Sequence, residues 1–150
     1  MSLNFEKKSV SELRNAVDNY MRNVVNGDDF INEQQFEDEV RDMLEAAGFI
    51  IQDKHNIENA IREINERQVS GAVFEKVPDI TVECREGLVF LELKFRNTEK
   101  MYRSDVEKVS KYRKLPECAA VGVLFLDEGY RYGWLRCLRN PKYYYYWDLR

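Results

Sequence analysis

The chain is predicted to fold as an α/β domain, a mixed β-sheet flanked by helices. Three observations support this class. Segments with helical apolar spacing are interleaved with strand-like apolar runs. A tight turn at 85–87 joins two neighbouring strand patterns, which makes part of the sheet antiparallel. A helical segment between Lys94 and Ala119 allows a crossover to a parallel strand.

Four segments have apolar residues at the i, i+3/i+4 spacing of helices that pack by one face. They cover residues 8–26, 32–47, 57–68 and 104–115. Ser9 or Ser11 is expected to cap the first helix. Asn32 and Gln35 form a capping-box pattern at the start of the second helix, and Gly48 follows its end. The helix at 8–26 is most simply interpreted as a packing element, whereas one broad face of the helix at 104–115 must be solvated or bound to something.

Strands are predicted where apolar residues run together or alternate with polar ones. They are 49–51, two strands within 77–95, 119–126, 131–138 and 143–147. The run 119–126 is uninterrupted, which is typical of a strand covered on both faces. In the second strand of the hairpin, alternation places Leu93 on an apolar face, and Glu92 and Lys94 on the opposite one.

Composition indicates one soluble domain spanning 1–150. The chain has 150 residues, of which 44% are hydrophobic and 33% charged. No apolar run approaches the roughly 18 residues of a membrane helix. The polar N-terminus has no secretory signal pattern, and Cys84, Cys118 and Cys137 match no metal-binding spacing. A cytoplasmic protein with reduced cysteines and no membrane partner is therefore expected.

Charge is distributed unevenly along the chain. The net charge is −4, yet residues 94–114 carry eight basic and three acidic residues. This distribution makes several basic side chains candidates for holding nucleic-acid phosphates. They are Arg96, Lys100, Arg103, Lys108 and Lys111. An ordinary solvated helix face explains the same charges equally well.

The hairpin brings chemically useful residues together at one strand end. Asp79 is expected opposite Glu92 or about one residue pair away, depending on register. Both are hard oxygen ligands of the kind that bind Mg²⁺ or Mn²⁺. Lys94 on the face of Glu92 is suited to orient or deprotonate a water and to offset phosphate charge. Glu37 is either an ordinary surface residue or points inward beside Phe36, and the sequence leaves both open.

These residues resemble the motif of the PD-(D/E)xK nuclease superfamily, including Holliday-junction resolvases and restriction nucleases. The resemblance rests on Pro78-Asp79, on Glu92-Leu93-Lys94, and on the helix from Phe36 to Gly48. It implies a restriction-endonuclease-like fold with a nuclease core at about 33–126. The N-terminal helix 8–26 and the aromatic C-terminal strands 131–148 lie outside this core.

The resemblance also implies a function, a metal-dependent nuclease that hydrolyses DNA. It implies Mg²⁺ or Mn²⁺ held by Asp79, Glu92 and the backbone carbonyl of Leu93, with Lys94 catalytic and Glu37 supporting. A homodimer is possible by the same analogy. Two alternatives stay open: a catalytically silent nuclease-fold subunit that binds nucleic acid or assembles with partners, and an α/β protein whose motif is coincidental.

Overall fold

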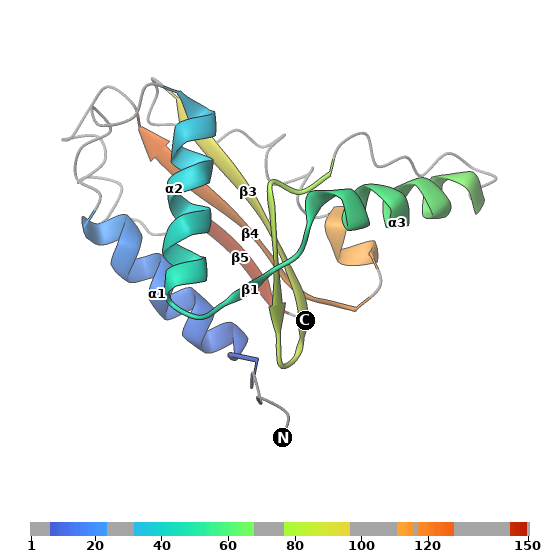
Figure 1. Ribbon diagram of the computed structural model, residues 1–150, viewed down its shortest axis with the longest axis horizontal. Helices are drawn as coiled ribbons and strands as arrows, with labels where there is room; N and C mark the ends of the chain where they lie inside the picture. Colours follow the sequence, from blue (N-terminus) through green and yellow to red (C-terminus); the bar gives the residue numbers. More distant parts are fainter. Residues whose placement is uncertain are drawn as a thin grey trace.

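A computed structural model describes residues 7–23, 32–67, 77–96, 111–115, 117–127 and 145–149. It is a mixed α/β structure, as predicted (Figure 1). Its helices are α1 (Val10–Asn23), α2 (Glu33–Ala46), α3 (Lys54–Arg67) and the 3₁₀ helix η2 (Tyr112–Lys114). Its strands are β1 (Ile50–Ile51), β2 (Ile80–Cys84), β3 (Gly87–Arg96), β4 (Cys118–Asp127) and β5 (Tyr145–Leu149). None of these helices is long and apolar enough to cross a membrane.

The five strands form one mixed sheet in the spatial order β1-β2-β3-β4-β5. β3 and β4 are parallel, and the other neighbouring pairs are antiparallel. The predicted antiparallel hairpin and the predicted parallel pairing of the strand that follows it are therefore both confirmed. The strand predicted at 131–138 lies outside the described residues, as does most of the helix predicted at 104–115.

Helices cover both faces of the sheet, and the alternation of β3 decides which residues meet them. α1 and α2 pack on the face that includes Leu91 and Leu93. α3 and η2 pack on the opposite face with Phe90, which lies in a second apolar cluster. Period-two alternation along a strand separates these two sets of side chains. It also turns Glu92 and Lys94 toward the face of α3 and η2.

Local hydrogen bonds explain where the helices begin. The Ser9 hydroxyl accepts the Glu12 N–H at 3.1 Å, and Asn32 Oδ1 accepts the Gln35 N–H at 2.9 Å, as N-caps do. α3 begins at Lys54 rather than at residue 57, so the predicted start of this helix was wrong. Asp53 is the reason, because its side chain accepts the His55 N–H at 2.8 Å and so starts the helix inside a polar run.

The hairpin turn is tied to the strand beyond it. Cys84 pairs with Gly87 across the two-residue turn Arg85-Glu86. Gly87 has a φ of +141°, and a Cβ at this position would collide with the Glu117 carbonyl oxygen. That oxygen accepts the Leu88 N–H at 2.7 Å, at the start of the parallel pairing. Glycine is required here for both conformation and close approach.

Candidate functional site

The end of the hairpin places Asp79 beside β3. Ile80 pairs with Leu91, so the register carries Asp79 to a position opposite Glu92. The first of the two predicted registers is therefore confirmed. Asp79 Oδ2 accepts the Leu93 N–H at 2.8 Å. Because the N–H and C=O of one strand residue point to the same side, the Leu93 carbonyl also faces the Asp79 side of β3.

Glu92 is a buried carboxylate on the face of α3 and η2, with a residue exposure of 2%. Lys94 Nζ lies 3.7 Å from Glu92 Oε2 and its side chain is 16% exposed. The Tyr112 hydroxyl, from η2, donates to Glu92 Oε1 at 3.1 Å. Packing between Tyr112 and Phe90, whose ring centroids are 6.2 Å apart, holds this hydroxyl toward the strand. Glu92 is thus approached by an ammonium and a phenol from two elements.

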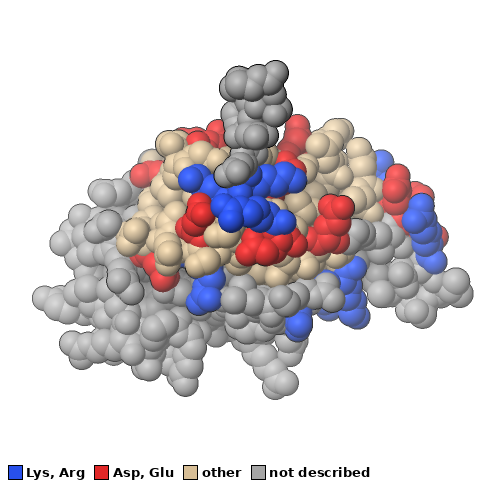
Figure 2. Space-filling view, turned by 90° about the horizontal axis from the view of Figure 1, so that it is seen from below, with Lys and Arg blue, Asp and Glu red and all other residues tan. Residues whose placement is uncertain are grey.

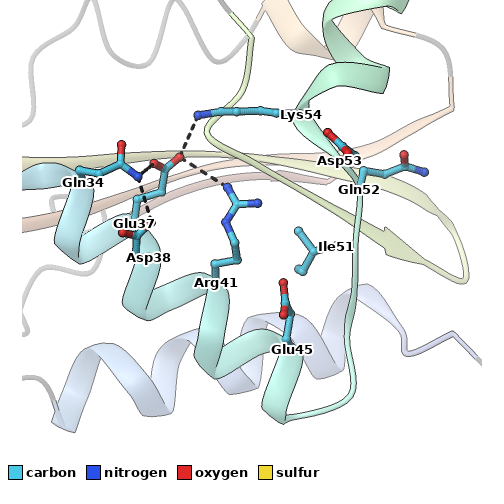
Figure 3. Close-up of a pocket in the computed structure, with 9 residues that line it drawn as sticks. All are labelled: Gln34, Glu37, Asp38, Arg41, Glu45, Ile51, Gln52, Asp53 and Lys54. Carbon is cyan, nitrogen blue, oxygen red and sulfur yellow. Dashed lines mark hydrogen bonds and ion pairs between the residues drawn. The ribbon is translucent and has the colours of Figure 1, made fainter.

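Glu37 is buried in α2, which resolves the alternative left open by the sequence. Gln34 donates to its carboxylate at 2.9 Å, and Lys54 at 3.2 Å. Arg41 lies 3.7 Å from the same carboxylate, one helical turn along α2. Figure 3 shows these three side chains converging on Glu37, with Lys54 reaching across from the start of α3. A groove of about 450 Å³ opens beside this group, lined by α2 and by the connection from β1 to α3.

Arg41 connects the Glu37 group to the Pro-Asp segment. Its guanidinium donates to the Asp79 backbone carbonyl at 2.9 Å while it pairs with Glu37. One rigid fork of donors therefore holds α2 against the start of β2. The three acids named by the sequence, Glu37, Asp79 and Glu92, lie in one region of the fold.

The carboxylates of this region influence one another. Burial, together with the charges of Glu92 and Glu37, raises the pKa of Asp79 from an ordinary value of 3.8 to about 7. The Leu93 hydrogen bond and the Lys54 ammonium act in the opposite direction. Burial and the adjacent Glu92 charge raise the pKa of Tyr112, which keeps its hydroxyl a donor at neutral pH. Each of these carboxylates disfavours the ionisation of its neighbours. A cation added between them would favour their ionised forms.

The available donors are hard oxygens. Asp79, Glu92 and the Leu93 carbonyl are of the type that Mg²⁺ and Mn²⁺ prefer, and Mg²⁺ is commonly held by one or two carboxylates with water completing its shell. Within the described ranges, no group of three or more His, Cys, Asp or Glu side chains is arranged to hold a metal ion. Two carboxylates and a carbonyl are thus the candidate oxygen donors, while Glu37 is engaged by Gln34, Arg41 and Lys54.

The basic residues named by the sequence are placed only in part. Arg96 is the last residue of β3 and Lys111 is exposed next to η2. Lys100, Arg103 and Lys108 lie outside the described residues. On the face seen in Figure 2, Lys and Arg lie next to Asp and Glu among the residues drawn in colour. This face therefore supplies no argument for phosphate binding.

Three members of the site were missed by sequence reasoning. Tyr112 lies within the helix predicted at 104–115 and Lys54 lies before the helix predicted at 57–68, and neither was named as a site residue. Arg41 carried a signal that was available, since it lies at i+4 from Glu37, the spacing of helical ion pairs. Lys54 and Tyr112 reach the site from elements distant in sequence, so no local pattern points to them.

No model of a known protein family matches the chain, and neither does any curated protein or any solved structure. Function is therefore inferred from the side chains at the hairpin end and their geometry.

Proposed function

We propose that the chain is a metal-dependent deoxyribonuclease of the PD-(D/E)xK type, with a restriction-endonuclease-like fold. One observation carries the proposal. The hairpin end brings half-buried Asp79 opposite buried Glu92, with the Lys94 ammonium 3.7 Å from Glu92. An ordinary solvent-facing Glu/Lys pair would be exposed, whereas the Glu92 carboxylate is inside the protein. Burying charge at this cost is typical of a site that uses it.

The donors suggest the chemistry. Asp79, Glu92 and the Leu93 carbonyl would hold Mg²⁺ or Mn²⁺, which supplies a Lewis acid for a phosphate and lowers the pKa of water at the site. Lys94 would orient the attacking water and offset phosphate charge as the phosphorus–oxygen bond to the leaving group breaks. Glu37, held by Arg41, would support the arrangement from α2.

The proposal that DNA is the substrate rests on the basic residues from the end of β3 onward in the sequence. Arg96, Lys111 and the basic positions between them would contact DNA phosphates, giving binding that weakens with salt. A homodimer would let two such sites act on two strands. Cys84 and Cys118 are buried thiols, which supports a reducing, cytoplasmic setting.

The proposal is tested by Mg²⁺- or Mn²⁺-dependent cleavage of single-stranded, duplex, flap and four-way-junction DNA. Wild type is expected to cut at least one substrate, and Lys94→Ala, Asp79→Asn and Glu92→Gln are each expected to abolish cleavage. Arg62→Ala is the matched control, because it removes an exposed cation from the outer part of α3. Circular dichroism and thermal unfolding verify that each variant is folded.

Two results would decide against catalysis. Equal behaviour of wild type and Lys94→Ala on every substrate would refute the nuclease. Salt-dependent DNA binding without cleavage by wild type would instead favour a catalytically silent nuclease-fold subunit.

A further inference from the structure

Glu37, Asp79 and Glu92 together are called the acidic centre. Lys54 is a cation at this centre, and it is not part of the nuclease motif. It is the first residue of α3, and its ammonium lies 3.2 Å from Glu37 Oε1. The Glu37 side chain is 6% exposed, whereas that of Lys54 is 41% exposed. Figure 3 shows the Lys54 side chain extended over the groove toward Glu37. A half-exposed lysine thus reaches a buried carboxylate from outside.

The cations at this centre are held differently. Arg41 has two anchors, the Glu37 carboxylate and the Asp79 backbone carbonyl at 2.9 Å. Lys94 lies beside Glu92 and is largely buried. Lys54 sits on a flexible stem at the rim, and its charge also acts on Asp79. Among these three, Lys54 is therefore the one placed to leave without disturbing the packing.

We propose that Lys54 is a built-in counterion of the acidic centre, where it compensates Glu37 and opposes the binding of a divalent cation by the neighbouring Asp79 and Glu92. The inference rests on the proposed metal-dependent function. Lys54 acts through Glu37 and is therefore a positioning residue. Its positive charge keeps the carboxylate group compensated while no metal is bound and lowers the affinity for the metal, because two cations at one centre repel each other.

The competition predicts opposite effects on two quantities. Replacing Lys54 with methionine removes the charge and keeps much of the apolar stem. Mn²⁺ is then expected to bind about fivefold more tightly, the size of effect that a partly exposed ion pair supports. The metal-free variant is expected to unfold at a lower temperature than wild type, and saturating Mn²⁺ is expected to remove most of this difference.

The experiment is calorimetric titration of Mn²⁺ into the intact protein at pH 8, with thermal unfolding in parallel. Lys54→Arg keeps the charge and is expected to retain wild-type affinity. Arg62→Met removes one cation from an exposed position on the same helix and is expected to leave affinity within about twofold. In wild type labelled at lysine, the ammonium resonance of Lys54 is expected to shift on adding Mg²⁺.

The outcomes separate this inference from the proposed function. If Mn²⁺ binds wild type and Lys54→Met with equal affinity, the counterion role is refuted while the metal centre stands. The role is also refuted if Lys54→Met is destabilised equally with and without Mn²⁺, because Lys54 would then be purely structural. If Mn²⁺ binds none of the proteins, the proposed function fails together with the inference.

Discussion

The Asp79 carboxylate and the Leu93 amide are joined by a hydrogen bond of 2.8 Å across the end of the hairpin. This bond continues the contact between the two strands after their backbone pairing stops at Ile80. It also fixes one Asp79 oxygen and leaves the other oriented by its surroundings. The ionisation of the Asp79 carboxylate can be tested directly, because it makes the stability of the protein depend on pH.

Asp79 makes the stability of the protein depend on pH. Its pKa is about 7 in the folded chain, against roughly 3.9 in an unfolded one. The folded state therefore holds this proton more tightly. The stability that comes from this proton is fully present below about pH 4 and is lost as the pH rises through about 7. The total loss of unfolding free energy is on the order of 2–4 kcal/mol.

Asp79→Asn removes this dependence and keeps an oxygen for the Leu93 N–H. The variant is expected to be more stable than wild type at pH 8, and by a smaller margin at pH 5. Urea unfolding at pH 4, 5, 6, 7 and 8 measures the difference. Asp42→Asn, at an exposed position on α2, is the control. Parallel pH curves for wild type and Asp79→Asn would show that Asp79 ionises normally.

The Tyr112 hydroxyl contributes through Glu92. Tyr112→Phe removes the donor at 3.1 Å from a carboxylate that is almost fully buried. The free energy of unfolding is expected to fall by about 1–3 kcal/mol at pH 7, because the carboxylate loses a buried hydrogen bond. Urea denaturation measures the change.

Tyr20 provides a matched control on α1. Its hydroxyl is buried and has no hydrogen-bond partner among the described residues. Tyr20→Phe is therefore expected to be neutral or stabilising, because it deletes an unsatisfied polar atom. Equal effects of the two substitutions would contradict the role assigned to the Tyr112 hydroxyl.

Gly87 tests the geometry that aligns β3 with β4. Gly87→Ala combines a φ of +141° with a collision against the Glu117 backbone. The expected loss of stability is about 3 kcal/mol or more. Gly48→Ala is the comparison, at a φ of +91°, where the nearest group among the described residues is the flexible Lys8 side chain. Its expected cost is about 1 kcal/mol, measured by the same urea unfolding, and equal costs would contradict the close approach at Gly87.

The sequence predicted the part of the site that depends on local periodicity. Two-residue alternation placed Glu92 and Lys94 on one face of β3 and Leu93 on the other, as observed. A short turn limited the hairpin to neighbouring registers, so Asp79 was expected near Glu92. Short-range rules therefore predicted two carboxylates and a lysine at one strand end.

The rest of the site, which is the burial of Glu37 and the contacts of Lys54 and Tyr112, depends on tertiary packing. The burial of Glu37 could not be predicted, because its position at the border of the α2 apolar stripe fits either environment. The Lys54 contact depends on where α3 starts, which Asp53 sets with a side-chain hydrogen bond inside a polar run. The Tyr112 contact depends on where η2 packs against β3 after a long connection. Interactions between distant elements leave no periodic signal in the sequence.

Arg41 provides the last test, because it joins the helix of Glu37 to the segment of Asp79. Arg41→Met removes both the bond to the Asp79 carbonyl and the ion pair with Glu37. A loss of about 1–3 kcal/mol in unfolding free energy is expected, since a part-buried carbonyl and a buried carboxylate each lose a charged donor.

The same substitution separates positioning from substrate binding. If the proposed nuclease activity is present, kcat is expected to fall by about tenfold or more with KM nearly unchanged, because Arg41 acts through Glu37 and Asp79. Arg41→Lys is expected to recover part of the stability, because it restores one donor but not the fork. Arg62→Met, on the exposed part of α3, controls for loss of charge. A raised KM with unchanged kcat would instead assign Arg41 to the binding of substrate.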